Sequence, residues 1–364
     1  MAVARRLSVI AVSVLTINFL AQLVRKPLWD GRDTDSISFA TEVVATATND
    51  AVVGLNETLR QAACAWGLGD GPEDHGGWKL LTEKVAMAPP RSSPRLLCLV
   101  YTHPPMHPLT DVAATTWAQD CDGFLAASTE HHGGYAVPMV HKGPEAYQNM
   151  WQKVRSLWEY VHREHPDYDY YHLGGDDMYV LVRNLRWFLS RNANETLFVG
   201  QRVFGSGQEF VHGGGGYTLS RRALERLVTE ALPQCHVHKQ VSYEDRMITQ
   251  CFRQIGILPA EFRDETGASY YHGSTPHSVY VTRPSTDKRA SFGAKAAAYG
   301  QSLPLNGDVA NRTLSKLDAA ARYSVSFHGL HTPFYLMRVH AILNPSFCPI
   351  DSPLGIVHRT RNKA

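Results

Sequence analysis

An apolar run that ends in two glycines and two aspartates limits the possible folds of this chain more than any other segment. Residues Tyr170–Leu173 have the composition of a buried strand, and Gly174 and Gly175 allow the backbone to turn sharply. Asp176 and Asp177 then project from the strand end. In open α/β sheets, ligands bind beyond the carboxyl ends of the strands. Carboxylate oxygens at such a site can bind Mg²⁺ or Mn²⁺. The two aspartates could instead cap the following helix, because Asp also favours that position.

Strands and helices alternate along the middle of the chain. The expected strands are residues 96–101, 124–127, 170–173 and 197–200, and the expected helices are residues 109–119, 147–161 and 181–189. Within the second helix, apolar residues recur at helical spacing at Trp151, Val154 and Val161. This alternation predicts an α/β fold in which helices cover both faces of the sheet.

Three shorter motifs follow, and each has a plain structural interpretation when it is read alone. Residues Gly213–Gly216 allow close approach of the backbone to a ligand, although a flexible loop would have the same composition. Glu244 and Asp245 open a helix, where acidic residues usually serve the helix dipole. His328 ends the expected strand Val325–His328, and a single histidine is more often structural than a metal ligand.

The N-terminus predicts a membrane anchor. Basic pairs stand on both sides of an apolar run, Leu7–Val24. A run of about 18 residues is near the lower limit for a membrane span and long for a signal-peptide core. We expect residues 1–26 to form a short cytoplasmic tail and an uncleaved signal-anchor helix. A cleaved signal peptide is the alternative, and the charge on both flanks leaves the orientation open. In either case the rest of the chain enters a secretory lumen.

Sequons and cysteines also favour the lumen. The candidate N-glycosylation sites are Asn56, Asn194 and Asn311, each in an Asn-x-Thr sequon. The chain has six cysteines, an even number that suits disulfides in an oxidising compartment. Their spacing includes no close Cys-x-x-Cys pair of the kind that binds zinc, and it cannot fix the pairing.

Turn and linker signals separate the anchor from the expected sheet. Gly- and Pro-rich stretches at residues 67–72 and 89–94 indicate that residues 27–95 form a stem. The segment 284–323 is rich in Ala, Ser and Gly, and we expect it to include a mobile loop. The net charge of +2 is close to neutral, so composition does not indicate nucleic-acid binding.

Taken in order, the motifs resemble the β1,3-glycosyltransferase superfamily, which includes fringe and the core 1 β1,3-galactosyltransferases. The matching segments are Thr115–Cys121, Asp176–Trp187, Gly213–Ser220 and Glu244–Cys251, followed by the Ser-Phe-His element that ends at His328. The resemblance extends over about residues 96–343. It implies a GT-A fold for these residues, with 344–364 as a C-terminal tail.

The resemblance also implies an activity and a location. It implies inverting, Mn²⁺-dependent transfer of galactose from UDP-galactose to O-3 of GalNAc on Ser or Thr of glycoproteins. It further implies a type II membrane protein of the Golgi or another secretory membrane, with the catalytic domain in the lumen, and a possible homodimer. A fringe-like transfer with another donor or acceptor is an alternative.

Residue roles follow from the matched motifs. The resemblance implies that Asp177 and His328 bind the metal, that Asp245 is the catalytic base oriented by Glu244, and that Lys153 pairs with the diphosphate. The other donor-binding residues that it implies are Trp151, Asp176, Gly214, Gly215 and Tyr335. The implied disulfides are Cys98–Cys121 and Cys235–Cys251, which leaves the pairing of Cys64 and Cys348 open.

One residue departs from the family pattern. Gly175 stands where the family motif begins with a third aspartate, so one carboxylate is missing near the expected metal. The superfamily also contains a chaperone without the acidic motif, and a non-catalytic lumenal chaperone is therefore a further alternative. The retained Asp177, Asp245 and His328 argue against it.

Overall fold

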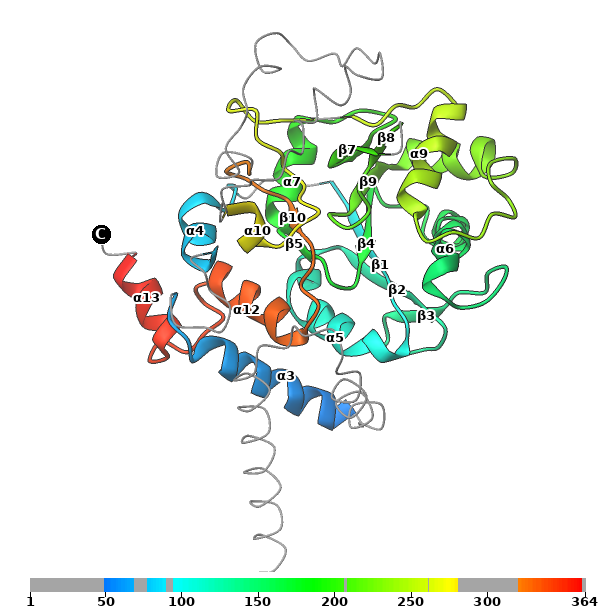
Figure 1. Cartoon of the computed structure of the whole chain (residues 1–364). Helices are drawn as coiled ribbons and strands as arrows, with labels where there is room; N and C mark the ends of the chain where they lie inside the picture. The colour runs from blue at the N-terminus through cyan, green and yellow to red at the C-terminus, as the bar shows by residue number, and fades with distance from the viewer. Residues whose placement is uncertain are drawn as a thin grey trace, which may run out of the picture.

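A six-stranded mixed sheet forms the centre of the computed structural model, which describes residues 49–68, 77–89, 94–205, 208–260, 262–280 and 320–361 (Figure 1). Its strands are β1 (Leu96–Tyr101), β2 (Gly123–Ser128), β3 (Ala136–Pro138), β4 (Tyr170–Gly175), β6 (Phe198–Gly200) and β9 (Tyr217–Ser220). They are ordered β3-β2-β1-β4-β9-β6. The first four run parallel, whereas β9 is antiparallel to β4 and β6. The carboxyl ends of β1 and β4 therefore meet at one edge.

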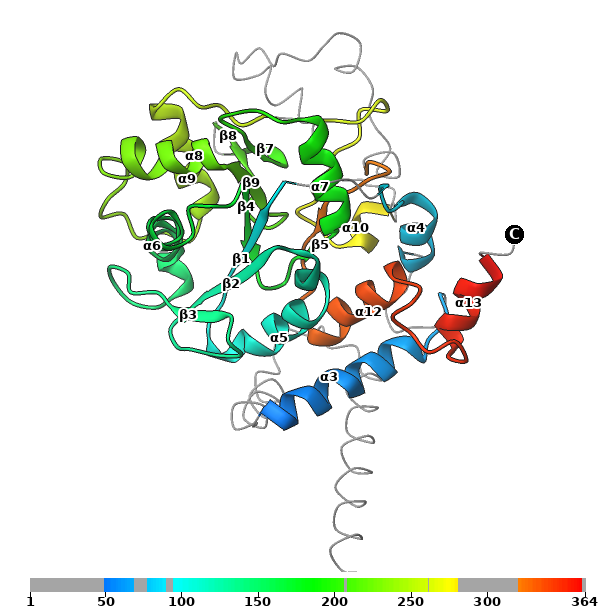
Figure 2. The ribbon, with the colours of Figure 1, turned by 180° about the vertical axis from the view of Figure 1, so that it is seen from behind.

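Helices cover both faces of this sheet, as Figures 1 and 2 show from opposite sides. One face carries α6 (Met150–Glu164), α8 (Arg221–Arg226) and α9 (Glu244–Gln254), and the other carries α5 (His107–Thr115), α7 (Val182–Arg191) and α12 (Pro333–Leu343). The side chains of β1 alternate between the two cores, with Leu97 and Leu99 in one and Cys98 and Val100 in the other. The predicted α/β class is confirmed.

The remaining elements surround this centre. The helices are α3 (Asn49–Cys64), α4 (Gly77–Lys84), α10 (Pro276–Tyr280) and α13 (Pro353–Arg361). Strand β5 (Tyr179–Val180) pairs with β10 (Ser326–Phe327), and β7 (Arg202–Gly205) pairs with β8 (Gln208–Val211). Three short 3₁₀ helices, η1 (Pro104–Met106), η2 (Trp117–Asp120) and η3 (Tyr147–Asn149), and one π-helical turn, η4 (Leu227–Ala231), complete the set. Strand β9 was not expected, because its four residues follow the glycine run and lead directly into α8. Its antiparallel pairing inserts it between β4 and β6.

Part of the predicted stem is folded onto the body. Helix α3 packs against α12, and the buried guanidinium of Arg338 donates hydrogen bonds to the carbonyl oxygens of Ala63, Trp66 and Gly67 at the end of α3. These bonds satisfy carbonyls that a helix leaves without partners at its C-terminus. Helices α3 and α4 thus contribute to the folded structure, although both lie within the expected stem of residues 27–95.

Three disulfides join distant parts of the described chain. Cys98–Cys121 and Cys235–Cys251 are the pairs that the family resemblance implies. Cys64–Cys348 completes the set and ties α3 to the segment after α12. The family resemblance left this third pair open, because Cys64 and Cys348 both lie outside the matched residues 96–343.

Several predictions concern residues outside the described ranges. The expected anchor, the sequon at Asn311 and most of segment 284–323 lie there. Within the described ranges, no helix combines the length and the apolar character that a membrane crossing requires.

The long disulfide should stabilise the fold more than a short one. Replacing Cys64 and Cys348 with serine removes a constraint on a loop of 284 residues, whereas the same change at Cys235 and Cys251 releases 16. The chain-entropy relation predicts losses of about 5.5 and about 3 kcal/mol in the free energy of unfolding. Urea-induced unfolding of both double variants tests this order. Equal losses, or a larger loss for the short loop, would contradict it.

Candidate active site

The carboxyl ends of β1 and β4 bring the first site residues together. Tyr101, the last residue of β1, is in register with Gly175 on β4. The Thr102 hydroxyl donates a hydrogen bond of 2.7 Å to Oδ2 of Asp176. Burial raises the pKa of Asp176 to about 7, the negative charge of Asp177 adds to this rise, and the bond from Thr102 partly offsets it. This carboxyl is therefore much less acidic than an exposed aspartate.

Asp177 is held by two histidines that arrive from a distant part of the chain. Pairing of β10 with β5 places His328 beside Asp177, with its Nε2 at 3.2 Å from Oδ2. Nδ1 of His331 lies 2.8 Å from the same oxygen. Burial alone would raise the pKa of Asp177, but the hydrogen bonds from both histidines outweigh it and keep the pKa below its usual range. Asp177 is thus the ionised member of the aspartate pair.

Gly175 gives Asp177 the space for this position. A Cβ atom on Gly175 would lie 2.8 Å from Oδ1 of Asp177, closer than real Cβ contacts allow. The volume that a third aspartate would need is therefore occupied by the carboxylate of Asp177. The glycine that replaces the first aspartate of the family motif thus leaves room for the Asp177 carboxylate.

The glycine run, Gly213–Gly216, packs tightly against neighbouring side chains and backbone. A Cβ on Gly214 would lie 2.8 Å from the ring of His328, and one on Gly215 would lie 2.9 Å from the backbone of His272. Gly216 has φ of 72° and approaches Met178 and His172. These contacts explain the glycines by packing. The predicted donor-binding role of Gly214 and Gly215 stays a prediction.

Asp245 lies at the N-terminus of α9, next to the glycine run. The backbone N–H of Gly213 donates to its Oδ2 at 3.0 Å, and the N–H of Arg246 donates to its Oδ1 at 2.8 Å. Both oxygens are thereby held in a defined orientation.

Glu244 points into the protein instead. Its Oε2 accepts a hydrogen bond of 3.1 Å from the Tyr217 hydroxyl, and Oε1 has no hydrogen-bond partner among the described residues. Burial, followed by the charge of Asp245, raises the pKa of Glu244 well above 4.5. The described hydrogen bond is therefore with Tyr217, and not with the Asp245 side chain that Glu244 was predicted to orient.

Tyr101 joins these groups into one site. Burial raises the pKa of its hydroxyl, and the surrounding carboxylates that raise it further are Glu244, Asp177, Asp245 and Asp176. The predicted base Asp245 and the predicted metal ligand Asp177 therefore both act on the Tyr101 hydroxyl. Sequence reasoning missed Tyr101 and Thr102, although they stand at the carboxyl end of the predicted strand 96–101, where ligands of such sheets bind. It also missed His331, three residues after His328.

Lys153 lies beside this cluster but already has partners. Its buried ammonium donates to the carbonyl oxygen of Thr102 and to Oε1 of Glu145. The other Glu145 oxygen is 2.6 Å from Nε2 of His141. Burial would raise the pKa of Glu145, but the bonds from Lys153 and His141 lower it below its ordinary value. The predicted pairing of Lys153 with a diphosphate would thus compete with a formed ion pair.

The other two predicted donor-binding residues have structural contacts. Trp151 is fully buried, and its indole N–H donates to the carbonyl oxygen of His236 at 3.0 Å. Tyr335 lies in the first turn of α12, where its backbone N–H bonds the Thr332 hydroxyl. Trp151 supports a neighbouring loop, and Tyr335 follows closely after His331.

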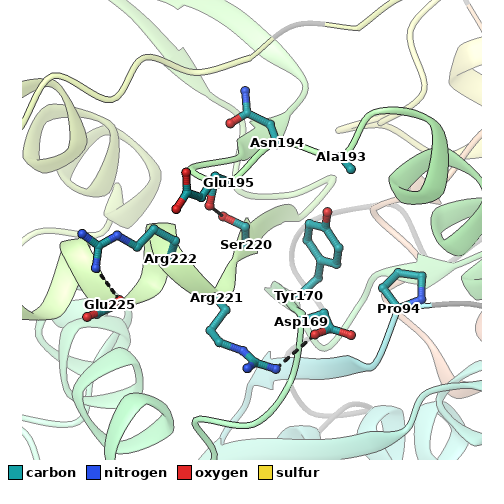
Figure 3. A pocket seen from close by; sticks show the side chains of 10 residues that line it. All are labelled: Pro94, Asp169, Tyr170, Ala193, Asn194, Glu195, Ser220, Arg221, Arg222 and Glu225. Carbon is teal, nitrogen blue, oxygen red and sulfur yellow. Dashed lines mark hydrogen bonds and ion pairs between the residues drawn. The ribbon is translucent and has the colours of Figure 1, made fainter.

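A hollow of about 630 Å³ lies elsewhere on the surface (Figure 3). It is formed at the amino end of β4, by Asp169 and Tyr170 together with Arg221 and Arg222. Asp169 and Arg221 are paired at 3.0 Å, and Asn194 of the second sequon stands at the rim. Because the acidic cluster lies at the opposite end of β4, this hollow is separate from the candidate active site.

Comparison with known proteins gives relatives of one kind. The chain is 27% identical to glycoprotein-N-acetylgalactosamine 3-beta-galactosyltransferase 1 of Xenopus laevis over 209 residues. These residues cover 56% of this chain and 55% of the relative. The chain resembles β1,3-glycosyltransferases. It is also 26% identical over 156 residues to mouse beta-1,3-glucosyltransferase, covering 40% of this chain and 30% of the relative. Human chondroitin sulfate synthase 3 is 29% identical over 164 residues, which cover 40% of this chain and 18% of the relative.

The resemblance inferred from the order of the motifs is thereby confirmed. No protein-family model matches the chain. The chain spans about half the length of the Xenopus relative and less of the other two.

The packing of Gly214 against His328 should make this position intolerant of a side chain. Gly214→Ala places a methyl group 2.8 Å from the imidazole and should lower the free energy of unfolding by about 1–3 kcal/mol. Gly54→Ala in α3 is the control, since nothing lies within 4 Å of its Cβ. The control should gain about 0.5–1 kcal/mol from helix propensity. Thermal or urea unfolding measures both changes, and a neutral Gly214→Ala would refute the packing.

The buried carboxyl of Glu244 should make stability depend on pH. Its pKa is raised in the folded chain, so the stability that it contributes is complete below its ordinary pKa of 4.5 and is lost as pH rises through the folded value. Glu244→Gln carries no titrating proton. Its free energy of unfolding should therefore increase relative to wild type between pH 5 and pH 8. Urea unfolding at both pH values measures this, and parallel pH profiles would contradict it.

Proposed function

We propose that this protein is an inverting glycosyltransferase that moves galactose from UDP-galactose to O-3 of GalNAc on Ser or Thr of glycoproteins. The observation that carries the proposal is the convergence of Asp176, Asp177, His328 and Asp245 around one strand end, in a chain related to a galactosyltransferase of that name. The mixed sheet, with its carboxylates at the end of β4, is compatible with a GT-A fold.

The donor atoms at Asp177 suit a divalent cation. No three His, Cys, Asp or Glu side chains within the described ranges are grouped to hold a metal by themselves. The rings of His328 and His331 both contact Oδ2 of Asp177, and their centres are 6.2 Å apart with an angle of 84° between the ring planes. A carboxylate and one imidazole are sufficient when phosphate oxygens complete the coordination, as cations of this class commonly require. We therefore propose Asp177 and His328 as the protein ligands of Mn²⁺.

Such a cation would offset the negative charge on a departing UDP. The base that we propose, Asp245, takes the proton of the acceptor hydroxyl while that oxygen attacks the anomeric carbon and the bond to UDP breaks. Its contacts suit this role, because two backbone N–H groups fix both carboxylate oxygens. Attack from the face opposite UDP inverts the anomeric configuration.

The membrane and the lumen complete the proposal. We propose that residues 1–26 anchor the protein in a Golgi or other secretory membrane, with the enzyme in the lumen as a possible homodimer. Three disulfides in the described structure agree with an oxidising compartment.

A fringe-like transfer is the second candidate, and one observation favours keeping it. The names of the relatives differ in the sugar transferred, since one is a galactosyltransferase and another a glucosyltransferase. A panel of UDP-sugars with a GalNAc-Thr peptide and Mn²⁺ distinguishes the candidates by product formation. Transfer of galactose supports the first. Absence of turnover with every donor and acceptor, together with rescue of a partner enzyme's folding, would favour the chaperone instead.

The proposed base gives a direct test. Asp245→Asn should lower the rate of transfer about 10²- to 10⁴-fold, because the amide cannot accept the hydroxyl proton. Binding of UDP with Mn²⁺ should remain, since Asp245 does not contact the metal ligands in this proposal. Product formation and calorimetric titration with UDP measure the two effects. Asp169→Asn at the surface hollow is the control and should retain full activity. An Asp245→Asn variant with the wild-type rate would show that the base is another residue.

A further inference from the structure

Exposed apolar side chains gather on two loops beside the candidate active site. Among the large hydrophobic side chains of the described residues, Val140, Tyr147 and Tyr243 are 92%, 70% and 41% exposed. They form half of the six such exposed side chains, and the others, Leu258, Ile350 and Ile356, lie on later segments. We call Val140, Tyr147 and Tyr243 the tyrosine rim. Exposed clusters of this kind commonly mark interaction sites.

The two loops adjoin each other at the start of α6. The backbone N–H of Trp151 donates a hydrogen bond of 3.1 Å to the carbonyl oxygen of Val241. The indole N–H of Trp151 donates to the carbonyl oxygen of His236. The loops also touch directly, because a Cβ on Gly143 would lie 2.5 Å from Nε2 of Gln240. The loops 139–149 and 236–243 therefore lie side by side.

The first loop is held in a defined shape. The Asn149 side chain donates to the carbonyl oxygens of Lys142 and Pro144 at 2.7 and 2.9 Å. Glu145 pairs with Lys153, which also bonds the carbonyl oxygen of Thr102. These contacts leave Tyr147 exposed on a loop whose backbone is already ordered, so binding there would lose little conformational entropy.

The second loop leads directly into the proposed base. Tyr243 precedes Glu244 and Asp245 at the start of α9. The guanidinium of Arg246 lies 5.4 Å from the centre of the Tyr243 ring and 4.7 Å from the centre of the Phe210 ring, so a cation–π contact supports the tyrosine. Tyr243 is therefore an exposed aromatic side chain on the segment that immediately precedes the proposed base.

We propose that the tyrosine rim is the acceptor-binding surface, with Tyr243 against the apolar face of the acceptor sugar and Tyr147 and Val140 against the adjoining peptide. This inference rests on the proposed function and deepens it. Tyrosine suits this surface because it offers a large apolar area at low entropic cost. A glycopeptide suits the rim because it carries both a sugar ring and an adjoining chain that can extend along the two loops.

Kinetics with both substrates test the proposal. Tyr243→Ala and Tyr147→Ala should each raise the KM for a GalNAc-Thr glycopeptide about 3- to 10-fold, the fold-change expected for one lost aromatic contact. The KM for UDP-galactose and the slow hydrolysis of UDP-galactose by water should not change. Tyr243→Phe and Tyr147→Phe should restore binding, because they keep the ring. Leu258→Ala is the control, since Leu258 is 69% exposed on a segment outside the rim.

The outcomes separate this proposal from the proposed function. Unchanged acceptor KM in both alanine variants overturns the inference while leaving the activity intact. An altered oligomeric state with unchanged acceptor KM also overturns it and identifies the rim as an interface between copies of the chain. If the wild-type protein transfers no sugar, the proposed function fails. Calorimetric binding of the same glycopeptide, weakened in the alanine variants but not in Leu258→Ala, would then still support the rim, and absence of binding would overturn it.

Discussion

The hydrogen bonds from two imidazoles to one oxygen of Asp177 are the interaction on which the site depends. They keep a largely buried carboxylate ionised beside Asp176, whose own carboxyl is driven toward the neutral form. Two adjacent buried charges would be costly, and this division of roles avoids that cost. It requires β10 to pair with β5, because only that pairing carries His328 and His331 to the end of β4.

The glycine run and Gly175 both leave space for the contact between Asp177 and His328. Gly214 leaves the space that the ring of His328 fills, and Gly175 leaves the space that Asp177 fills. A chain with a third aspartate at position 175 would need another arrangement of the second carboxylate. In this chain the space beside Gly175 is filled by the carboxylate of Asp177, which also contacts His328.

Helix α12, which follows the segment that carries His328 and His331, packs against α3. Helix α12 begins directly after His331, and its buried Arg338 bonds the carbonyl oxygens at the end of α3. The Cys64–Cys348 disulfide closes the same region covalently. Helix α3, which lies within the segment predicted as a stem, is thus part of the structure that supports the segment containing His328 and His331.

Local pattern was sufficient for much of this protein. The alternation of apolar runs and helical spacing determined the α/β class, and the order of the motifs determined the kinship and the main acidic residues. What only the tertiary structure decided involves contacts between segments that are distant in sequence. Strand β9, the Cys64–Cys348 pair, the contact of His331 with Asp177, and the burial of Glu244 against Tyr217 are of this kind. Sequence periodicity records which face of an element is apolar, but it does not record which other element that face meets.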